Sequence, residues 1–493
     1  MSDETIADYV GRNSGVAFHA PEGTFTWAEY DDLSSRLARS YVDSGLAPGA
    51  RIAVLLTGGA LTHIAYLAAQ KAGLVTVGIG PRAGDAEIAH LLRKTGAALA
   101  TRATHRGRSG AEIAARCGAA RHLVLDLDAL AALPGGPLPD GRSPLGPGDI
   151  FFLNSTSGTT GLPKVVRQTL DNRKYFGPLA HAAGRMGPDE VFASVLPAPY
   201  GFGLWSAHVV PAMYGYPTVL TAEFDAGETL RLIERHRVTV LCAVTAQFIM
   251  LLNDPAFAAT DLSSLRLMFT GGERVPLARA REFEQRTGCA VLQFYGSNEA
   301  GPISVTTVDD PPEARLTTAG RPIPEMRLRL VDGGQISVNG PGCTPGYLDD
   351  EAANAVLFDA DGRLRTGDIG SIDADGYLSI TGRIADFIIR GGHNVSALVV
   401  EEAVAGHPSV AAVAVVAAPD PVLGERACAY VVTRGPLTLD DLRKHLDAGG
   451  VGKQNWPEHL VELPALPLST GGKVDKAALR ADAAARYGVT EPD

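Results

Sequence analysis

Apolar side chains recur at helical spacing in residues 27–44 and then give way to short, continuous apolar runs. Thr26 and Glu29 stand at the start of the first segment with the spacing of a capping box, and Gly45 follows its end. We therefore predict an amphipathic helix that begins after Thr26 and ends near Gly45. The apolar stripe of this helix consists of Tyr30, Leu33, Leu37 and Tyr41.

Apolar runs and amphipathic segments alternate along the first half of the chain. The run "RIAVLL" at residues 51–56 has the length of a buried strand, and residues 85–95 have a helical pattern. Such alternation is typical of a doubly wound α/β fold with a parallel sheet. Residues 133–149 are rich in proline and glycine and are expected to form a surface connection. Further strands are expected at residues 150–154, 239–244, 267–270 and 290–294.

The pattern changes twice in the C-terminal half. From Val331 onward, short strands and turns predict a β-rich or barrel-like piece. After Arg383, residues 386–493 contain their own helices and two apolar strands, at 410–418 and 427–432. This is enough for a small α+β domain. The sequence therefore predicts a large N-terminal region followed by a small C-terminal domain.

Composition limits the class of protein and its partners. The 493 residues are 45% hydrophobic and 20% charged, a globular mixture that is longer than one usual domain. The net charge of −11 argues against nucleic acid and against an anionic membrane surface as partners. The N-terminus lacks the pattern of a secretory signal, and the longest apolar run, 410–418, is about half of what a bilayer span needs. We expect a cytoplasmic protein without a membrane partner.

The cysteines support the same compartment. They are five in number, widely scattered and never in a C-x-x-C pair, so they indicate neither a disulfide framework nor a zinc site. A reducing cytoplasm suits this pattern. The cysteines are Cys117, Cys242, Cys289, Cys343 and Cys428.

The loop "STSGTTGLPK", residues 155–164, directly follows the predicted strand 150–154 and carries the first candidate chemistry. Its glycines let backbone N–H groups approach an anion, its hydroxyls donate hydrogen bonds, and Lys164 adds a positive charge. The spacing is not that of a Walker A loop, in which Ser or Thr follows the lysine. Taken alone, such a run is more often a polar surface loop. The candidate phosphate-binding residues are Thr156, Ser157, Gly158, Thr159, Thr160, Gly161 and Lys164.

Six further segments make this loop one motif of an ordered series that spans nearly the whole chain. The series resembles the signature of the adenylate-forming (ANL) superfamily, which contains acyl- and aryl-CoA ligases, peptide-synthetase adenylation domains and luciferases. It is most similar in pattern to stand-alone acyl- or aryl-CoA ligases. The segments are "FTWAEY" from Phe25, "FTGGERV" from Phe269, "QFYGSNEAG" from Gln293, "LRTGDIG" from Leu364, "DGYLSITGRIADFIIRGGHN" from Asp375 and "PLSTGGKVDK" from Pro467.

The resemblance implies a fold and a domain organisation. An α/β region of residues 1–384 would hold two doubly wound sheets and a β-barrel-like piece. A hinge at Ala385 would connect it to a small mobile α+β domain, residues 386–493.

The resemblance also assigns roles in ATP binding. The 156–164 loop would grip the β- and γ-phosphates, and Glu299 would bind the Mg²⁺ that bridges them. One tyrosine would lie on the adenine, and a glycine-rich segment would lie on the other side of the ring. These residues are Tyr295 with Gly296, and Gly271, Gly272 and Glu273.

Two residues and one departure complete the expected nucleotide site. Asp368 corresponds to the ribose-binding carboxylate of the family, whose two oxygens suit a vicinal diol. Arg383 would contact ribose or phosphate. Without this context, Asp368 would be interpreted as a turn residue and Arg383 as half of a surface ion pair. The family usually has Thr where Asn298 stands, so a contact of residue 298 with phosphate or metal would lack the hydroxyl.

Lys473 matches the catalytic lysine that reaches the carboxylate and the α-phosphate. The family alternates two arrangements of its small domain, one that places this lysine and one that admits the acceptor. The pivot would be Ala385, and Gly391 and Gly392 would line the tunnel for the pantetheine of the acceptor. The catalytic residues implied are thus Lys473, Glu299 and Arg383. The chain departs from the usual pattern around this half-reaction at Ala385, Ala397 and Val399.

Residues 196–210 lie where relatives line the acyl pocket. The rings in this stretch favour a flat aryl or cyclic acid over a fatty chain, although the core of a helix would show the same residues. Siderophore-pathway activators of 2-hydroxybenzoate have Asn where Gly201 stands, which disfavours a salicylate-type acid. The expected pocket residues are Tyr200, Phe202, Phe248, Gly271 and Gly296.

The sequence therefore predicts ATP-dependent activation of a small carboxylic acid through an acyl- or aryl-adenylate, with Mg²⁺, followed by transfer to a thiol. CoA is the expected acceptor. Transfer to a carrier protein or to an amine is the first alternative, and a nucleotide-binding homologue without turnover is the second. A luciferase-like reaction would share the same ATP site. Nothing in the sequence indicates an oligomeric state.

Overall fold

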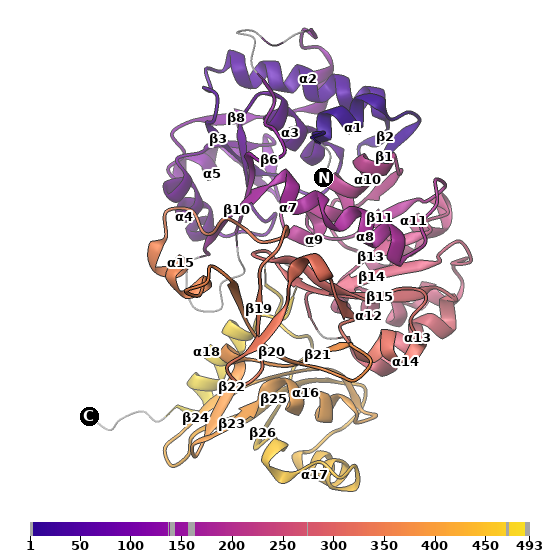
Figure 1. The fold of residues 1–493 in the computed structure, drawn as a ribbon, viewed down its shortest axis with the longest axis vertical. Coiled ribbons are helices and arrows are strands. Elements are labelled where there is room, and N and C mark those ends of the chain that lie inside the picture. The colour runs from indigo at the N-terminus through magenta and orange to yellow at the C-terminus, as the bar shows by residue number, and fades with distance from the viewer. Residues whose placement is uncertain are drawn as a thin grey trace. The chain divides into compact units, whose positions relative to one another are not determined.

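The structure, a computed structural model, describes residues 3–136, 138, 143–155, 163–273, 275–469 and 473–488. The chain forms two compact units, and Figure 1 shows the course of the chain through them. Unit 1 contains residues 1–327 and 338–364, and unit 2 contains residues 328–337 and 365–493. Each unit has its own sheets and its own hydrophobic core.

The larger sheet of unit 1 has nine strands. In order across the sheet they are β17 (Arg321–Pro322), β16 (Gly301–Val305), β15 (Ala290–Ser297), β14 (Leu267–Gly271), β13 (Val240–Cys242), β11 (Phe192–Ser194), β12 (Thr218–Leu220), β1 (Val16–Ala20) and β2 (Gly23–Thr26). The strands from β15 to β1 are parallel, and the strands outside them at both edges run antiparallel. The carboxyl ends of the parallel strands therefore share one edge, which is where open α/β sheets hold ligands.

The second sheet of unit 1 has six strands. In order they are β10 (Val165–Thr169), β9 (Ile150–Ser155), β4 (Val75–Gly78), β3 (Arg51–Leu55), β5 (Ala98–Thr101) and β8 (His122–Val124). All neighbours are parallel except β9 and β10, in which Ser155 lies opposite Val165. The candidate phosphate loop therefore connects the carboxyl end of β9 to the start of its antiparallel neighbour. The predicted strands at 51–56 and 150–154 are confirmed.

Helices form where the patterns predicted them. α2 (Trp27–Asp43) begins after Thr26, whose hydroxyl accepts a hydrogen bond from Glu29 N while the Glu29 carboxylate accepts one from Thr26 N. This is the predicted capping box, and the predicted apolar stripe of α2 is buried. α4 (Asp85–Thr95) has the predicted bounds. α2 packs against α3 (Ala60–Lys71) (Figure 1).

The other helices of unit 1 are mostly short. They are α1 (Ile6–Arg12), α5 (Gly110–Arg116), α6 (Leu127–Ala131), α7 (Leu170–Lys174), α8 (Phe176–Ala183), α9 (Gly201–Leu204), α10 (Val210–Tyr214), α11 (Ala226–His236), α12 (Thr245–Asn253), α13 (Leu277–Thr287), α14 (Pro312–Thr317) and α15 (Glu351–Leu357).

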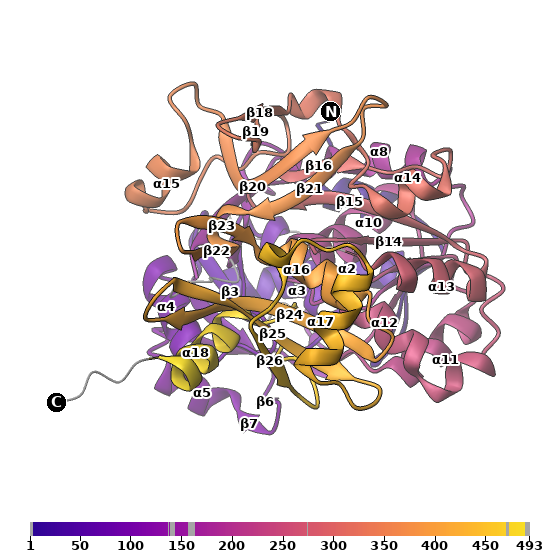
Figure 2. The ribbon, with the colours of Figure 1, turned by 90° about the horizontal axis from the view of Figure 1, so that it is seen from below.

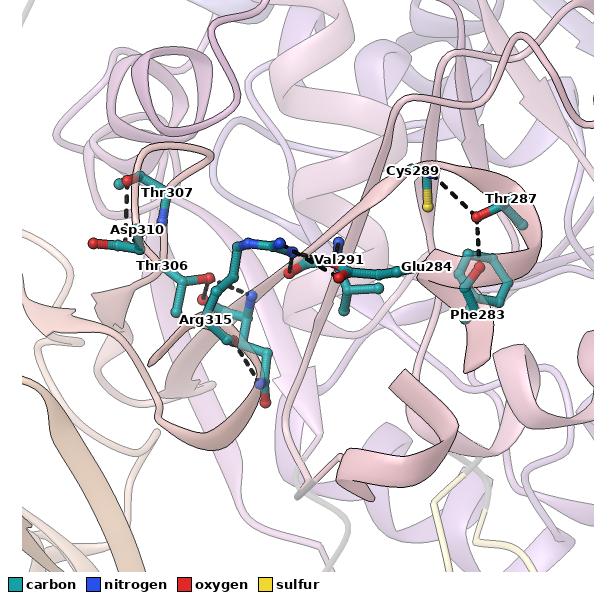
Figure 3. A network of polar contacts seen from close by, with 10 residues as sticks. Phe283, Glu284, Thr287, Cys289, Val291, Thr306, Thr307, Asp310 and Arg315 are labelled. Atoms are coloured by element: carbon teal, nitrogen blue, oxygen red, sulfur yellow. Dashed lines mark hydrogen bonds and ion pairs between the residues drawn. The ribbon is translucent and has the colours of Figure 1, made fainter. Parts of the chain in front are cut away.

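A polar network fastens β15, the strand that leads into the "YGSNEAG" motif (Figure 3). Glu284 on α13 accepts a hydrogen bond from Val291 N at 2.7 Å and pairs with the guanidinium of Arg315 on α14. Arg315 also donates from Nη1 to Val291 O at 3.1 Å. One buried ion pair thus holds two helices and a strand together.

Unit 2 contains a four-stranded sheet and a five-stranded sheet. The first consists of β18 (Arg329–Val331), β19 (Gln335–Val338), β20 (Leu364–Ile372) and β21 (Leu378–Arg383). The second consists of β23 (His393–Ser396), β22 (Phe387–Arg390), β25 (Gly424–Thr433), β24 (Val410–Asp420) and β26 (His459–Glu462), which pairs with β25. The predicted strands 410–418 and 427–432 form its longest pair.

Side chains of β24 and β25 alternate between two cores. Val415 and Ala429 pack with α16 (Ala397–Ala405) and α17 (Leu439–Ala448). Their neighbours in sequence, such as Tyr430, pack with α18 (Lys476–Tyr487) on the other face (Figure 2). The continuous apolar runs are thus explained by a sheet that helices cover on both sides.

Two further findings concern the chain as a whole. Among the residues that the structure describes, no helix is long and apolar enough to cross a bilayer. All five cysteines are free, and four of them are buried.

Candidate active site

Glu299, the carboxylate of the "YGSNEAG" motif, is held by a tyrosine that lies outside all the recognised motifs. Tyr347 donates its hydroxyl to Glu299 Oε1 at 2.9 Å. The Nζ of Lys164 lies 4.9 Å from the centroid of the same tyrosine ring, which is a cation–π distance. The tyrosine is only 7% exposed, so its ring is fixed by packing. The end of the candidate phosphate loop and the motif carboxylate therefore meet at one side chain.

The backbone around Glu299 is also fixed from several sides. Thr344 N donates to Glu299 O at 2.6 Å, and Glu299 N donates to Ser297 Oγ at 3.2 Å. The amide of Gln168 donates from Nε2 to Asn298 O at 2.7 Å. These contacts orient the carboxylate before any ligand binds.

Asn298, which stands where the family usually has Thr, makes a contact that a threonine could not reach in the same way. Its Oδ1 accepts a hydrogen bond from Gly201 N at 3.0 Å. Gly201 is the first residue of α9, so the longer side chain ties the motif to the stretch that was predicted to line the acid pocket. The departure therefore has a structural consequence within unit 1.

Arg173 on α7 lies beside these residues and was not among the sequence-predicted site residues. It is 4% exposed, and it donates from Nε to Gln168 Oε1 at 3.0 Å and from Nη2 to Asn298 O at 2.8 Å. Burial lowers the pKa of Arg173 to about 10. The guanidinium therefore still carries its charge at neutral pH.

Rings from three segments gather next to the start of α9. Phe202 meets Phe294 edge-on with centroids 4.7 Å apart, and Trp205 lies 5.7 Å from Phe269. Trp205 begins a π-helical turn, Trp205–Val209, a geometry that is rare and often found at functional sites. The indole Nε1 of Trp205 is buried and has no hydrogen-bond partner among the described residues. Phe202, Phe294 and Trp205 thus form a cluster, called the aromatic wall, that contains one N–H donor without a described hydrogen-bond partner.

Other predicted pocket residues lie in different surroundings. Tyr200 and Phe202 are half-buried, whereas Phe248 is fully buried and packs edge-on against Phe283 at 5.8 Å. The structure therefore joins Phe202 to the aromatic wall and gives Phe248 a place in the core between α12 and α13. A role of Phe248 in the pocket stays a prediction.

The residues predicted to surround the adenine lie on the neighbouring strands β14 and β15. Gly271 pairs with Phe294, and a Cβ at residue 271 would lie 2.4 Å from Phe294 O. A Cβ at Gly296 would lie 2.2 Å from Gly301 O. Both glycines are therefore required by the close approach of backbone. Gly272 adopts a φ of +85°, while Glu273 accepts from Ala246 N at 3.4 Å, and Tyr295 is half-buried on β15.

Most of the phosphate loop lies outside the described residues. These are Thr156, Ser157, Gly158, Thr159, Thr160 and Gly161. Their role in binding phosphate stays a prediction. Ser155 and Lys164, which flank them, are buried and exposed respectively.

Two of the predicted nucleotide residues meet within unit 2. Asp368 on β20 and Arg383 on β21 lie opposite each other, and Arg383 Nε lies 3.0 Å from Asp368 Oδ1. The Asp368 side chain is 12% exposed, whereas that of Arg383 is 50% exposed. The arginine therefore orients a largely buried carboxylate and keeps part of its own surface for other contacts.

The predicted lysine and hinge also lie in unit 2. Lys473 O accepts from Ser469 N at 2.7 Å, and Lys473 is half-buried. Ala385 lies in an exposed single turn of 3₁₀ helix, Ile384–Asp386. Gly391 and Gly392 form the exposed turn between β22 and β23 with φ of +57° and +83°. The roles of these residues as catalyst, pivot and tunnel stay predictions.

Two departures from the family pattern, Ala397 and Val399, lie in α16. Ala397, its first residue, is buried, and Val399 is half-buried. Trp456 donates its indole N–H to Val451 O at 2.8 Å and packs against the core of unit 2. Its packing role is thus evident.

Comparison with known proteins decides the family. Residues 10–348 match the family described as AMP-binding enzyme, and residues 399–473 match the AMP-binding enzyme C-terminal domain. The chain belongs to this family. The superfamily predicted from the motifs and the α/β fold with a small C-terminal domain are thereby confirmed.

Relatives of this AMP-binding enzyme differ in their acceptors. The salicyl-AMP ligase / salicyl-S-ArCP synthetase of Mycobacterium tuberculosis is 33% identical over 486 residues, covering 93% of this chain and 85% of that protein. The medium-chain fatty-acid–CoA ligase of Escherichia coli is 32% identical over 499 residues, covering 93% and 86%. The structure of the amide bond synthetase McbA from Marinactinospora thermotolerans superposes with a TM-score of 0.84 at 29% identity, covering 97% of this chain and 98% of that chain.

The donor set of this AMP-binding enzyme fits the Mg²⁺ that the family implies. Glu299 Oε1 accepts the Tyr347 hydroxyl, and the described contacts leave Oε2 available. Mg²⁺ is usually held by one or two carboxylates together with phosphates and water. In the described part of the chain, no group of three or more His, Cys, Asp or Glu side chains is placed to hold a metal. A single carboxylate that shares a tyrosine with Lys164, the last residue of the candidate phosphate loop, is therefore compatible with this ion.

Sequence reasoning missed the residues that connect the motifs of this AMP-binding enzyme. Tyr347 lies between two motifs and carries no chemistry of its own. Arg173 and Gln168 lie just after the phosphate loop in "RQTLDNRKY", where the basic residue occupies a position that packing buries. The one sequence signal that could have identified this site is the charged Arg173 within a helical segment.

Proposed function

We propose that this AMP-binding enzyme activates a small carboxylic acid with ATP, forms an acyl- or aryl-adenylate with release of pyrophosphate, and passes the acyl group to a thiol. CoA is the first candidate for that thiol. The observation that carries the proposal is the contact of Tyr347 with both Glu299 and Lys164. It brings a carboxylate and a cation from two motifs together, as charge stabilisation on a departing pyrophosphate requires.

In unit 1 the proposed work falls to the residues around Tyr347. Lys164 would neutralise charge on the β- and γ-phosphates. Glu299, oriented by Tyr347, would hold Mg²⁺, which when bound acts as a Lewis acid toward phosphate oxygens. The backbone of Gly271 and Gly272 would admit the adenine at close range.

In unit 2 the proposed work falls to three charged residues. Asp368 would accept the ribose hydroxyls, and Arg383 would hold that carboxylate in place. Lys473 would supply a compact positive charge to the reacting carboxylate and the α-phosphate. Ala385 would be the pivot that changes the arrangement of the small domain between the two half-reactions.

The aromatic wall of Phe202, Phe294 and Trp205 supports an aryl or cyclic acid. Aromatic side chains favour contact with another ring over contact with a flexible chain. The unused indole N–H of Trp205 would be satisfied by a polar group of the acid.

The acceptor is the less constrained half of the proposal. The names of the relatives include a CoA ligase, a synthetase that loads a carrier protein and an amide bond synthetase. CoA is preferred because the motif pattern is that of stand-alone acid–thiol ligases, while carrier protein and amine remain the alternatives. The five free cysteines agree with work in the reducing cytoplasm.

Exchange of pyrophosphate into ATP tests the first half-reaction without any acceptor. Purified protein, Mg²⁺ and ATP are combined with a panel of aryl, cyclic, fatty and amino acids. We expect exchange with aryl or cyclic acids, which is then followed by product analysis with CoA, carrier protein and amine.

Two variants control this experiment. Glu299→Gln should remove exchange, whereas Glu313→Gln, at a side chain that is 68% exposed on α14, should not. Nucleotide binding without exchange for any acid would favour a homologue that does not turn over, and light emission with a luciferin would reveal the monooxygenase reaction.

A further inference from the structure

Arg173 is a buried cation that forms no direct ion pair with a described carboxylate, although Glu299 stabilises its charge from a longer distance. Its hydrogen bonds go to the side-chain oxygen of Gln168 and to the backbone oxygen of Asn298, and both acceptors are neutral. Arg315, an arginine of similar burial, shows the usual solution, because it is paired with the carboxylate of Glu284. Arg173 differs from Arg315 in lacking such a direct pair.

Such an arrangement is unfavourable unless a ligand completes it. Removing a charge from water costs several kcal/mol in effective terms, and neutral acceptors compensate it only in part. The lowered pKa of Arg173 reflects this cost, since burial is its leading cause. An apolar side chain of similar length would fill the same space without the cost. The position thus holds a charge that neutral hydrogen-bond acceptors and the more distant Glu299 compensate only in part.

The third nitrogen of the guanidinium indicates where a partner would bind. Nη1 makes no hydrogen bond to the described residues and lies beside Gly201. A Cβ at residue 201 would lie 3.1 Å from Nη1 and 2.6 Å from Asn298 Oδ1. A side chain at 201 would therefore crowd the guanidinium, and glycine keeps this approach open. Gly201 begins the segment that carries Phe202 and Trp205 of the aromatic wall.

We propose that Arg173 binds a second oxygen group on the carboxylic acid, a carboxylate or a hydroxyl carried in addition to the carboxylate that is adenylated. This inference rests on the proposed function and names the substrate class of the same site. Arg173 is then the specificity residue, and Gln168 holds its guanidinium by accepting from Nε and Nη2. A charge-assisted hydrogen bond in a desolvated pocket supplies the preference.

The phosphates of ATP are a less suitable partner for this arginine. Lys164 and Glu299, which are proposed to serve the phosphates, are linked through Tyr347. Arg173 feels the charge of Glu299 only at longer range; its direct contacts are with Gln168 and the backbone of Asn298, and its Nη1 lies beside Gly201 at the start of α9. The partner oxygen group is therefore assigned to the acid.

A matched set of acids tests the proposal. Benzoate, 2-hydroxybenzoate and phthalate share a ring and one carboxylate, and they differ in the second oxygen group. Two readouts are taken: kcat/KM for pyrophosphate exchange, and the rise in Tm that each acid causes in the absence of ATP. For the wild-type protein we expect the best acid with a second group to exceed benzoate by roughly tenfold or more in kcat/KM. The better of phthalate and 2-hydroxybenzoate identifies the group.

Variants of Arg173 separate specificity from structure. Arg173→Met removes the charge at similar length and should fold, because apolar replacements of buried charges are often neutral or stabilising. It should abolish the preference, so that the ratio of kcat/KM between the preferred acid and benzoate falls to about one. Arg173→Lys keeps a charge and should retain part of the preference, and it also serves if the methionine variant fails to fold.

Each outcome decides between the two proposals. Equal treatment of the three acids by the wild-type protein, or an equal loss for all of them in Arg173→Met, would overturn the role of Arg173. If the wild-type protein exchanges no acid, the proposed function has failed, and the rise in Tm alone decides about Arg173. A larger rise in Tm with phthalate or 2-hydroxybenzoate than with benzoate in the wild type, and no such difference in Arg173→Met, supports binding of the second group at Arg173. Equal shifts in both proteins overturn it.

Discussion

At the scale of single residues, the hydroxyl of Tyr347 is the group that fixes the motif carboxylate. Tyr347→Phe keeps the ring beside Lys164 and removes the hydrogen bond to Glu299 Oε1. A hydrogen bond to a charged group contributes about 1.5–3 kcal/mol, so kcat for pyrophosphate exchange should fall roughly tenfold or more. KM for the acid should stay the same, because the lost contact lies on the phosphate side of the proposed site.

A second tyrosine provides the matched control for that variant. Tyr430 donates its hydroxyl to Asp482 Oδ2 at 2.7 Å in the core of unit 2. Tyr430→Phe removes the same kind of bond and should lower Tm without changing exchange. Equal exchange rates in the two variants would show that the Tyr347 contact has no part in catalysis.

Residues also show how far a sequence can be interpreted at this scale. Thr26 and Glu29 are three positions apart, so a local rule predicted their capping box. Arg173 and Asn298 are 125 positions apart, and Asn298 and Gly201 are 97 apart. No local pattern encodes such contacts, because they depend on which strands become neighbours. The motif residues were therefore found from the sequence, and the residues that connect them were not.

At the scale of elements, the ion pair of Arg315 with Glu284 determines how α13 and α14 hold β15 (Figure 3). Arg315→Ala leaves Glu284 largely buried without its counter-charge. Breaking a buried pair from one side typically costs about 3–5 kcal/mol, so the free energy of unfolding in urea should fall by about this amount.

A surface pair offers the control for this measurement. Arg281 pairs with Glu313 at side-chain exposures of 47% and 68%. Arg281→Ala should cost at most about 1 kcal/mol. Similar losses in both variants would mean that the buried pair contributes nothing beyond ordinary surface electrostatics.

Helices and strands were predicted well where a local sequence pattern defines them. They were predicted poorly where the structure depends on which strands pair with each other. The helix at 85–95 and the strand from Val410 were predicted from spacing and from apolar runs, and both are confirmed. The antiparallel turn-back of β10 onto β9 was not predicted, since the run "VVRQT" could pair with any edge. The π-helical turn at Trp205–Val209 was likewise unpredicted, because its residues suit an ordinary α-helix. Sheet order thus needed the structure.

At the scale of the whole molecule, the proposal requires two half-reactions that different residues of unit 2 serve. Lys473→Ala should lower pyrophosphate exchange by at least roughly a hundredfold, because it removes the charge that stabilises the transition state. Thioester formation from chemically supplied adenylate and CoA should persist in this variant. Lys444→Ala, at a side chain that is 80% exposed on α17, is the control and should change neither step.

Gly392→Leu should give the opposite result. Gly392 has a φ of +83° and no atom within 4 Å of an added Cβ, so a leucine there would project into open space at the proposed tunnel as well as strain the turn. Exchange should survive, and thioester formation should be lost. Gly376 has a φ of +85° and the same open surroundings in the turn between β20 and β21, so Gly376→Leu reproduces the strain at a different place. Loss of thioester formation in Gly376→Leu as well would assign the effect to strain in unit 2, whereas loss in Gly392→Leu alone would place the acceptor at the turn between β22 and β23.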